Sequence, residues 1–90
     1  MTSFGHALDE LMKRRGFSPQ RLARLLGTRA ETISDFQKDP DFPCSQWVKL
    51  FVADLGAVMQ LTALERSKLL IAVQEDRRAH NGQAAQVETG

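Results

Sequence analysis

The chain contains few of the residues from which small proteins build covalent or metal-bound scaffolds. Its 90 residues include a single cysteine, Cys44, which excludes an internal disulfide and a multi-cysteine metal site. No apolar run approaches the ~18 residues that read as a membrane span. The amphipathic start, MTSFGHALDELMK, does not resemble a signal peptide. We therefore expect one small domain in the cytoplasm, with no membrane segment.

Patterns that carry catalysis are also missing. The sequence has no glycine-rich phosphate loop, no cluster with metal-ligand spacing and no nucleophile beside a plausible base. In each of the two pairs of adjacent acidic residues, Asp9–Glu10 and Glu75–Asp76, the two side chains would point to different sides of a helix. The two histidines, His6 and His80, lie far apart in sequence. We therefore expect a protein that is not an enzyme and that carries neither a metal nor a cofactor.

Positive charge is concentrated in one part of the chain. The net charge is +1, from 12 basic and 11 acidic residues. Residues 11–30 hold six of the basic residues and no acid, which leaves 6 basic and 11 acidic residues, or −5, elsewhere. A basic segment on an otherwise acidic chain is typical of a surface that binds a polyanion. The alternative is an ordinary solvated helical face.

Residues 18–38 have the pattern of two short helices joined by a tight turn. Ser18 followed by proline is a strong helix start, and Gly27 allows the backbone to reverse. Ile33 and Phe36 give the second helix an apolar side. This pattern predicts a helix-turn-helix, although a plain helical hairpin has the same spacing.

The flanking sequence predicts further helices. The first is capped by Thr2 or Ser3 and stops at Gly16, and a capping box places the cap of the third helix at Thr28, ending it before Asp39–Pro40. After a loop over residues 39–45, Ser45 caps a fourth helix over residues 46–55 that Gly56 ends. Residues 57–61 are ambiguous between strand and helix.

A second capping box, at Thr62 and Glu65, begins a fifth helix that runs to about His80 and ends at Asn81–Gly82. The expected core, including Trp47 and the phenylalanines, follows the apolar periodicity of these helices. Its other members are Leu8, Leu11, Met12, Leu22, Leu25, Leu26, Ile33, Val48, Val52, Leu55, Leu64, Leu69, Leu70, Ile71 and Val73.

The ordered segments KRRGFS, RLARLLG, TRAETIS and LFVADLG, within residues 8–61, resemble the Cro/C1-type (XRE) helix-turn-helix family of bacteria and phages. The stretch TISDFQKDPD and the short AVMQL segment make the chain most similar to the HipB-type antitoxins of that family. The resemblance implies an all-α, lambda-repressor-like bundle of four to five helices. One variant replaces the last helix by a short C-terminal strand, over residues 57–61, that pairs across a dimer.

The resemblance also implies which residues contact DNA. In the family, the start of the second helix of the helix-turn-helix, which we call the reading helix, faces the base edges. The start of the first helix of the helix-turn-helix meets phosphate. The implied positions are Ser18, Gln20, Arg24, Arg29, Ala30, Glu31, Thr32, Ser34 and Lys38. Two departures are Pro19, where the family commonly has glutamine, and Arg29, where it commonly has a serine or threonine cap.

From these features we predict a sequence-specific transcriptional repressor that binds a palindromic double-stranded operator as a homodimer, and that is the antitoxin of a toxin–antitoxin pair. The alternatives are a toxin-neutralising protein-interaction module with little or no DNA binding, and a phage-type regulator without a toxin. The predicted organisation is a DNA-binding domain over residues 1–61, a helical extension for dimerisation or partner contact over residues 62–82, and a disordered tail over residues 83–90.

Overall fold

The computed structural model describes residues 1–89, with side chains described for residues 1–80. The described chain is all-α and has no strand, which confirms the predicted helix-turn-helix bundle. The elements in order are α1 (Ser3–Arg15), α2 (Pro19–Leu26), α3 (Ala30–Lys38), the short 3₁₀ helix η1 (Phe42–Cys44), α4 (Val48–Val58) and α5 (Ala63–Thr89). No helix among these residues is long and apolar enough to cross a membrane.

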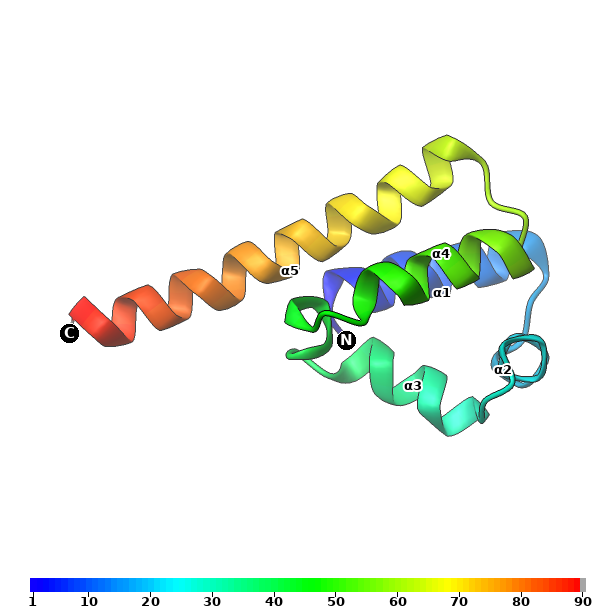
Figure 1. Ribbon diagram of the computed structural model, residues 1–90, viewed down its shortest axis with the longest axis horizontal. Helices are drawn as coiled ribbons and strands as arrows, with labels where there is room; N and C mark the ends of the chain where they lie inside the picture. The colour runs from blue at the N-terminus through cyan, green and yellow to red at the C-terminus, as the bar shows by residue number, and fades with distance from the viewer. Residues whose placement is uncertain (90) are drawn as a thin grey trace.

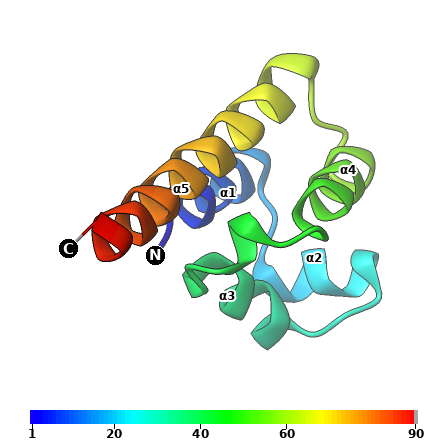
Figure 2. The same cartoon turned by 60° about the vertical axis from the view of Figure 1, so that its left-hand side comes forward.

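The long helix α5 forms one side of the bundle, where it packs against α1 and α4 (Figure 1). Helices α2 and α3 pack against each other on the opposite side, and α1 runs between the two sides, as Figure 2 shows from a second direction. Because α2 and α3 lie at the edge of the bundle, only one side of each helix is covered by the core.

The core combines apolar residues from all five helices and η1. Most of the residues that we expected to be buried lie there, but five do not, and the predictions for these five were wrong. Leu25 and Trp47 are 50% and 61% exposed. Leu64, Leu70 and Ile71 of α5 are also exposed. The buried apolar residues are Phe4, Leu8, Leu11, Met12, Leu22, Ala23, Ile33, Phe42, Val48, Val52, Leu55, Met59, Leu61, Leu69, Ala72 and Val73.

Four phenylalanines join α1, α3, η1 and α4 at the centre of the bundle. The rings of Phe36 and Phe42 stack with their centroids 4.1 Å apart, and Phe51 meets both of them edge-on. Phe4 of α1 closes the group, 5.9 Å from Phe42. These contacts fix the end of α3 against the bundle.

Gly5 marks a close approach between α1 and α3. A Cβ atom at this position would lie 2.2 Å from the backbone oxygen of Gln37, so only glycine fits. The buried side chain of Gln37 donates a hydrogen bond to the Gly5 oxygen at 3.0 Å, and the Gln37 backbone oxygen accepts one from the Thr2 backbone N–H at 3.1 Å. The C-terminal end of α3 is therefore held against the start of α1.

The fourth helix begins and ends later than predicted. Ser45 does not cap it, because its hydroxyl accepts a hydrogen bond from Trp47 N–H at 2.9 Å within a turn that precedes Val48. Gly56 does not end it either. Its missing side chain leaves room for Arg66, whose Cδ would lie 2.8 Å from a Cβ there.

The chain leaves α4 at Gln60, which has a left-handed φ of 53°. Leu61 N–H then donates to the Gly56 oxygen at 3.0 Å, as in a Schellman ending. Residues 57–61 are therefore the last turn of α4 and a bend, so the strand alternative for this segment was wrong. Both Met59 and Leu61 are buried within the bundle itself.

The fifth helix begins as predicted, with Thr62 and Glu65 forming a reciprocal capping box. It continues past Asn81–Gly82 to Thr89, where the sequence predicted a helix end followed by a disordered tail. A glycine inside a helix interior lowers stability by only ~1 kcal/mol, so it does not by itself stop a long helix. The final residue, Gly90, lies outside the described part of the chain.

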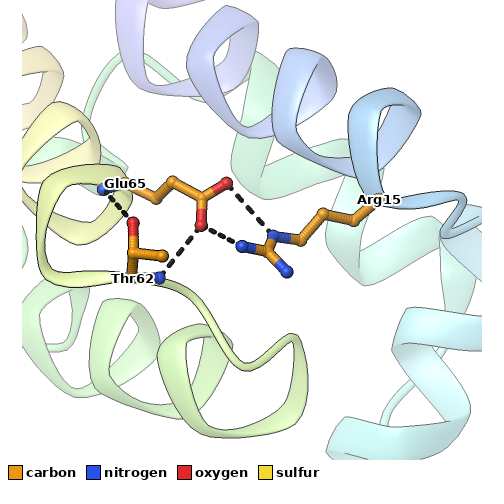
Figure 3. A network of polar contacts seen from close by, with 3 residues as sticks. All are labelled: Arg15, Thr62 and Glu65. Atoms are coloured by element: carbon orange, nitrogen blue, oxygen red, sulfur yellow. Dashed lines mark hydrogen bonds and ion pairs between the residues drawn. The ribbon is translucent and has the colours of Figure 1, made fainter.

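Two carboxylates of α5 hold the two ends of α1. At the C-terminal end, Arg15 binds Glu65, which also belongs to the capping box (Figure 3). At the N-terminal end, the carboxylate of Asp76 accepts the backbone N–H groups of Ser3 and Phe4 at 2.9 and 2.8 Å. These bonds satisfy helix-end donors that have no partner within α1. The long helix is thus an integral part of the bundle.

Candidate nucleic-acid interface

The turn between α2 and α3 is built by local interactions that the sequence largely predicts. The Ser18 hydroxyl accepts the Arg21 N–H at 3.1 Å, and proline follows it at the first helical position. Gly27 has the left-handed φ of 72° expected of a helix ending. Thr28 N–H then donates to the Ala23 oxygen at 2.9 Å, which completes the ending of α2.

The start of α3 differs from the prediction. Thr28 does not cap it, because the Thr28 backbone belongs to the ending of α2, and Arg29 occupies the N-cap position instead. The Arg29 oxygen accepts hydrogen bonds from Thr32 and Ile33 at 3.1 and 3.3 Å, while its side chain makes no capping bond. Because the Arg29 side chain is exposed, its guanidinium extends into solvent from the residue directly before the reading helix.

The two faces of α3 have different environments. Ile33 and Gln37, four residues apart, point into the bundle and are buried. The outer face carries exposed charged side chains and half-buried small ones. None of the nine predicted contact residues is buried: Ser18, Gln20, Arg24, Arg29, Glu31 and Lys38 are exposed, and Ala30, Thr32 and Ser34 are half-buried.

Pairing within the chain removes two of the six basic residues from the predicted electrostatic surface. The Lys13 Nζ lies 2.9 Å from the Asp9 Oδ2. The hydrogen bond and the charge attraction between them raise the pKa of the lysine. Arg15 pairs with Glu65, and that hydrogen bond raises the arginine pKa. The remaining four are Arg14, Arg21, Arg24 and Arg29, none of which has an ion-pair partner within residues 1–80.

Two of those four arginines line a groove, and the other two do not. Arg14 and Arg21 line a groove at the far end of α1, and Arg21 also stacks on the Phe17 ring with its guanidinium carbon 4.7 Å from the ring centroid. Arg24 and Arg29 do not line this groove. Of the six basic residues of the segment, Arg14, Arg15 and Arg21 therefore line the groove and the other three do not.

Acidic side chains also occupy the outer part of α3 and the residue after it. Glu31, Asp35 and Asp39 are all exposed, and Asp39 follows Lys38 at the end of the helix. Carboxylates near phosphates are repelled, unless one accepts a hydrogen bond from the N4 amino group of cytosine. The surface around α3 is consequently mixed in charge.

The positions that sequence reasoning missed are those whose partners lie far along the chain. Gln37 is the main example, because a glutamine within a charged helix gives no signal that it is buried against Gly5, 32 residues away. Trp47 is the opposite case, a large aromatic residue at the start of α4 that the bundle leaves exposed. Periodicity alone places it with the core.

Comparison with known proteins adds no relative to these observations. The chain matches no model of a protein family, no curated protein and no solved structure. Among the described residues, no group of three or more histidine, cysteine or acidic side chains is placed to hold a metal ion.

Proposed function

We propose that this protein is a DNA-binding transcriptional repressor of the Cro/C1 (XRE) type. The observation that carries the proposal is the position of Arg29, exposed at the N-cap of an α3 whose outer face is uncovered, directly after the Gly27 turn. A helix held in this way is suited to the major groove. Arginine at its start can make two hydrogen bonds to guanine O6 and N7, worth ~1–3 kcal/mol of discrimination.

The remaining predicted residues would support this contact. Ser18 and Gln20 lie at the start of α2, where they would meet phosphate, and Arg24 and Lys38 would add charge at either side. Thr32 and Ser34 are half-buried hydroxyl residues on α3. A repressor of this kind acts in the cytoplasm, and we propose that location too.

We also propose that the protein acts as a homodimer on a palindromic operator. Leu64 and Ile71 of α5 are 68% and 53% exposed and lie seven residues apart, on one side of the helix. Two copies would present their α3 helices to successive major-groove faces ~34 Å apart, which blocks polymerase sterically. Sedimentation that finds a monomer at tens of micromolar protein would contradict the dimer.

The DNA proposal is tested by fluorescence anisotropy with the DNA directly upstream of the gene, beside a scrambled duplex of the same length, at two salt concentrations. We expect tighter binding to the upstream DNA, with an affinity that falls as salt rises. Arg29→Ala should remove most of that preference, and the exposed Arg78→Ala on α5 is the matched control. Equal binding of both duplexes by the wild-type protein would refute sequence-specific recognition.

A second function is favoured by the exposed acids on and after α3. Glu31, Asp35 and Asp39 weaken a DNA contact but suit a protein partner with a basic surface, as in a toxin-neutralising module. The repressor could itself be an antitoxin, or a phage-type regulator without a toxin, because all these versions share one fold. Failure to bind either duplex at low salt would favour the protein-interaction module.

A further inference from the structure

A groove lies where the ends of α1 and α4 meet α2, the first helix of the helix-turn-helix. Its volume is about 640 Å³, and its walls include Arg14, Arg21, Leu25, Val58, Met59 and Gln60. None of the nine residues predicted to contact DNA lines it. A volume of this size is within the range of pockets that bind small molecules, roughly 300–1,000 Å³.

The groove carries excess positive charge. Three arginines line it, Arg14 and Arg15 from the end of α1 and Arg21 from α2, against one carboxylate, Glu65. That carboxylate is already bound to Arg15 and to the backbone of Thr62. Arg14 and Arg21 are consequently left without an acid partner among the described side chains, and guanidinium groups bind carboxylates and phosphates through two parallel hydrogen bonds.

The same groove has an apolar wall. Leu25 is half-exposed on the side of α2 that carries Arg21 one turn earlier, although leucine at this position was expected to be in the core. Val58, half-buried at the end of α4, continues the apolar surface beside it, and the backbone continues into Met59, whose side chain is buried. Guanidinium groups and exposed apolar carbon atoms therefore lie within the same groove.

The geometry points to a binding site for a small amphiphilic anion, with its carboxylate or phosphate held between Arg14 and Arg21 and its apolar part against Leu25 and Val58. Gln60 also lines the groove and supplies a neutral hydrogen-bonding group. The site uses none of the nine residues predicted to contact DNA, although Arg14 and Arg21 also belong to the basic segment of residues 11–30.

The test is a titration of the full chain, labelled with ¹⁵N, followed by amide chemical shifts in NMR spectra. Four probes are used: octanoate, octyl phosphate, inorganic phosphate and octylammonium. We expect saturable shifts with the two amphiphilic anions, centred on the amides of Leu25, Met59 and Gln60, and weaker or no saturation with the other two. The preference between octanoate and octyl phosphate identifies the favoured head group.

Variants distinguish this site from general electrostatic attraction. Arg14→Gln and Arg21→Gln should each weaken octanoate or octyl phosphate binding about tenfold, since each removes charge-assisted hydrogen bonds. Arg78→Gln removes an equal charge from an exposed position on α5 and should leave binding unchanged. All three are surface substitutions, so the fold should be retained.

Three outcomes would overturn the proposal. The first is an absence of saturable shifts with either amphiphilic anion. The second is equal binding of inorganic phosphate and octyl phosphate, which would remove the role of the apolar wall. The third is a loss of affinity in Arg78→Gln as large as in Arg14→Gln, which would mean that only net charge matters.

Discussion

The guanidinium of Arg15, the last residue of α1, binds both carboxylate oxygens of Glu65 in the first turn of α5 (Figure 3). The same carboxylate accepts the backbone N–H of Thr62 at 2.9 Å, and the Thr62 hydroxyl accepts the N–H of Glu65 at 3.1 Å. Arg15, followed by the Thr62 backbone, lowers the pKa of Glu65 from 4.5 to about 2. One carboxylate thus connects the start of α5 to the end of α1.

We expect this ion pair to make stability depend on pH in the acid range. A carboxyl group whose pKa falls on folding stabilises the folded state above its unfolded pKa, near 4.5, and this contribution is lost as the pH falls toward 2. Glu65→Gln keeps an oxygen that can accept from Thr62 but removes the charge. Urea unfolding at about pH 6 and about pH 3 should therefore show a larger loss of stability in the wild type than in the variant. Equal losses would contradict this role.

Asp76 provides a second prediction, because it caps α1 from 73 residues away. Asp76→Ala leaves the N–H groups of Ser3 and Phe4 without their acceptor and should reduce the free energy of unfolding by about 1–2 kcal/mol. The neighbouring Glu75→Ala removes an equal charge from an exposed position and should change it by less than ~0.5 kcal/mol. Urea unfolding measures both, and similar losses in the two variants would show that the capping bonds contribute nothing.

The left-handed backbone at Gln60 predicts a stabilising substitution. A non-glycine residue at this φ is strained, so Gln60→Gly should raise the free energy of unfolding by about 0.5–1 kcal/mol. The opposite result is expected for Gln74→Gly, an exposed position inside α5 where glycine costs ~1 kcal/mol. Thermal unfolding of both variants tests the contrast, and a lower Tm for Gln60→Gly would show that the glutamine side chain contributes more than the strain.

For the proposed DNA contact, Glu31 provides a test that separates general repulsion from base recognition. If its carboxylate faces phosphate, Glu31→Gln should bind both the upstream and the scrambled duplex a few-fold more tightly at low salt. If it accepts a hydrogen bond from cytosine N4, the variant should lose affinity for the upstream DNA alone. Glu75→Gln, on the exposed side of α5, controls for the change in net charge. An unchanged affinity for both duplexes would place Glu31 outside the interface.

The sequence predicted features that depend on neighbouring residues. The Ser18 cap, the Gly16 and Gly27 endings and the Thr62–Glu65 capping box are each confirmed, because each is a bond between residues a few positions apart. The Thr28 cap failed for a local reason as well, since the ending of α2 had already used its backbone. Where so few residues separate two helices, the ending of the first helix and the cap of the second compete for the same backbone groups.

The contacts that fix the helices relative to one another could not be predicted in this way. Arg15 and Glu65 lie 50 residues apart, and the sequence around either residue does not indicate that the other is its partner. The exposed Leu25 illustrates the same limit for the groove, because periodicity assigned it to the core while α4 and α1 leave that side of α2 open. The nine residues of the DNA interface remain a prediction whose exposure the fold permits.

The two carboxylates on α5 also set a distance. Glu65 and Asp76 are 11 residues apart (76 − 65), which is about three helical turns, so both face the same side and meet opposite ends of α1. Inserting or deleting one residue between them would rotate one carboxylate by about 100° and move it by about 1.5 Å. The length of the segment between them is therefore fixed by the length of α1. Residues on its outer face can be exchanged, but a change in its length would release one end of the first helix.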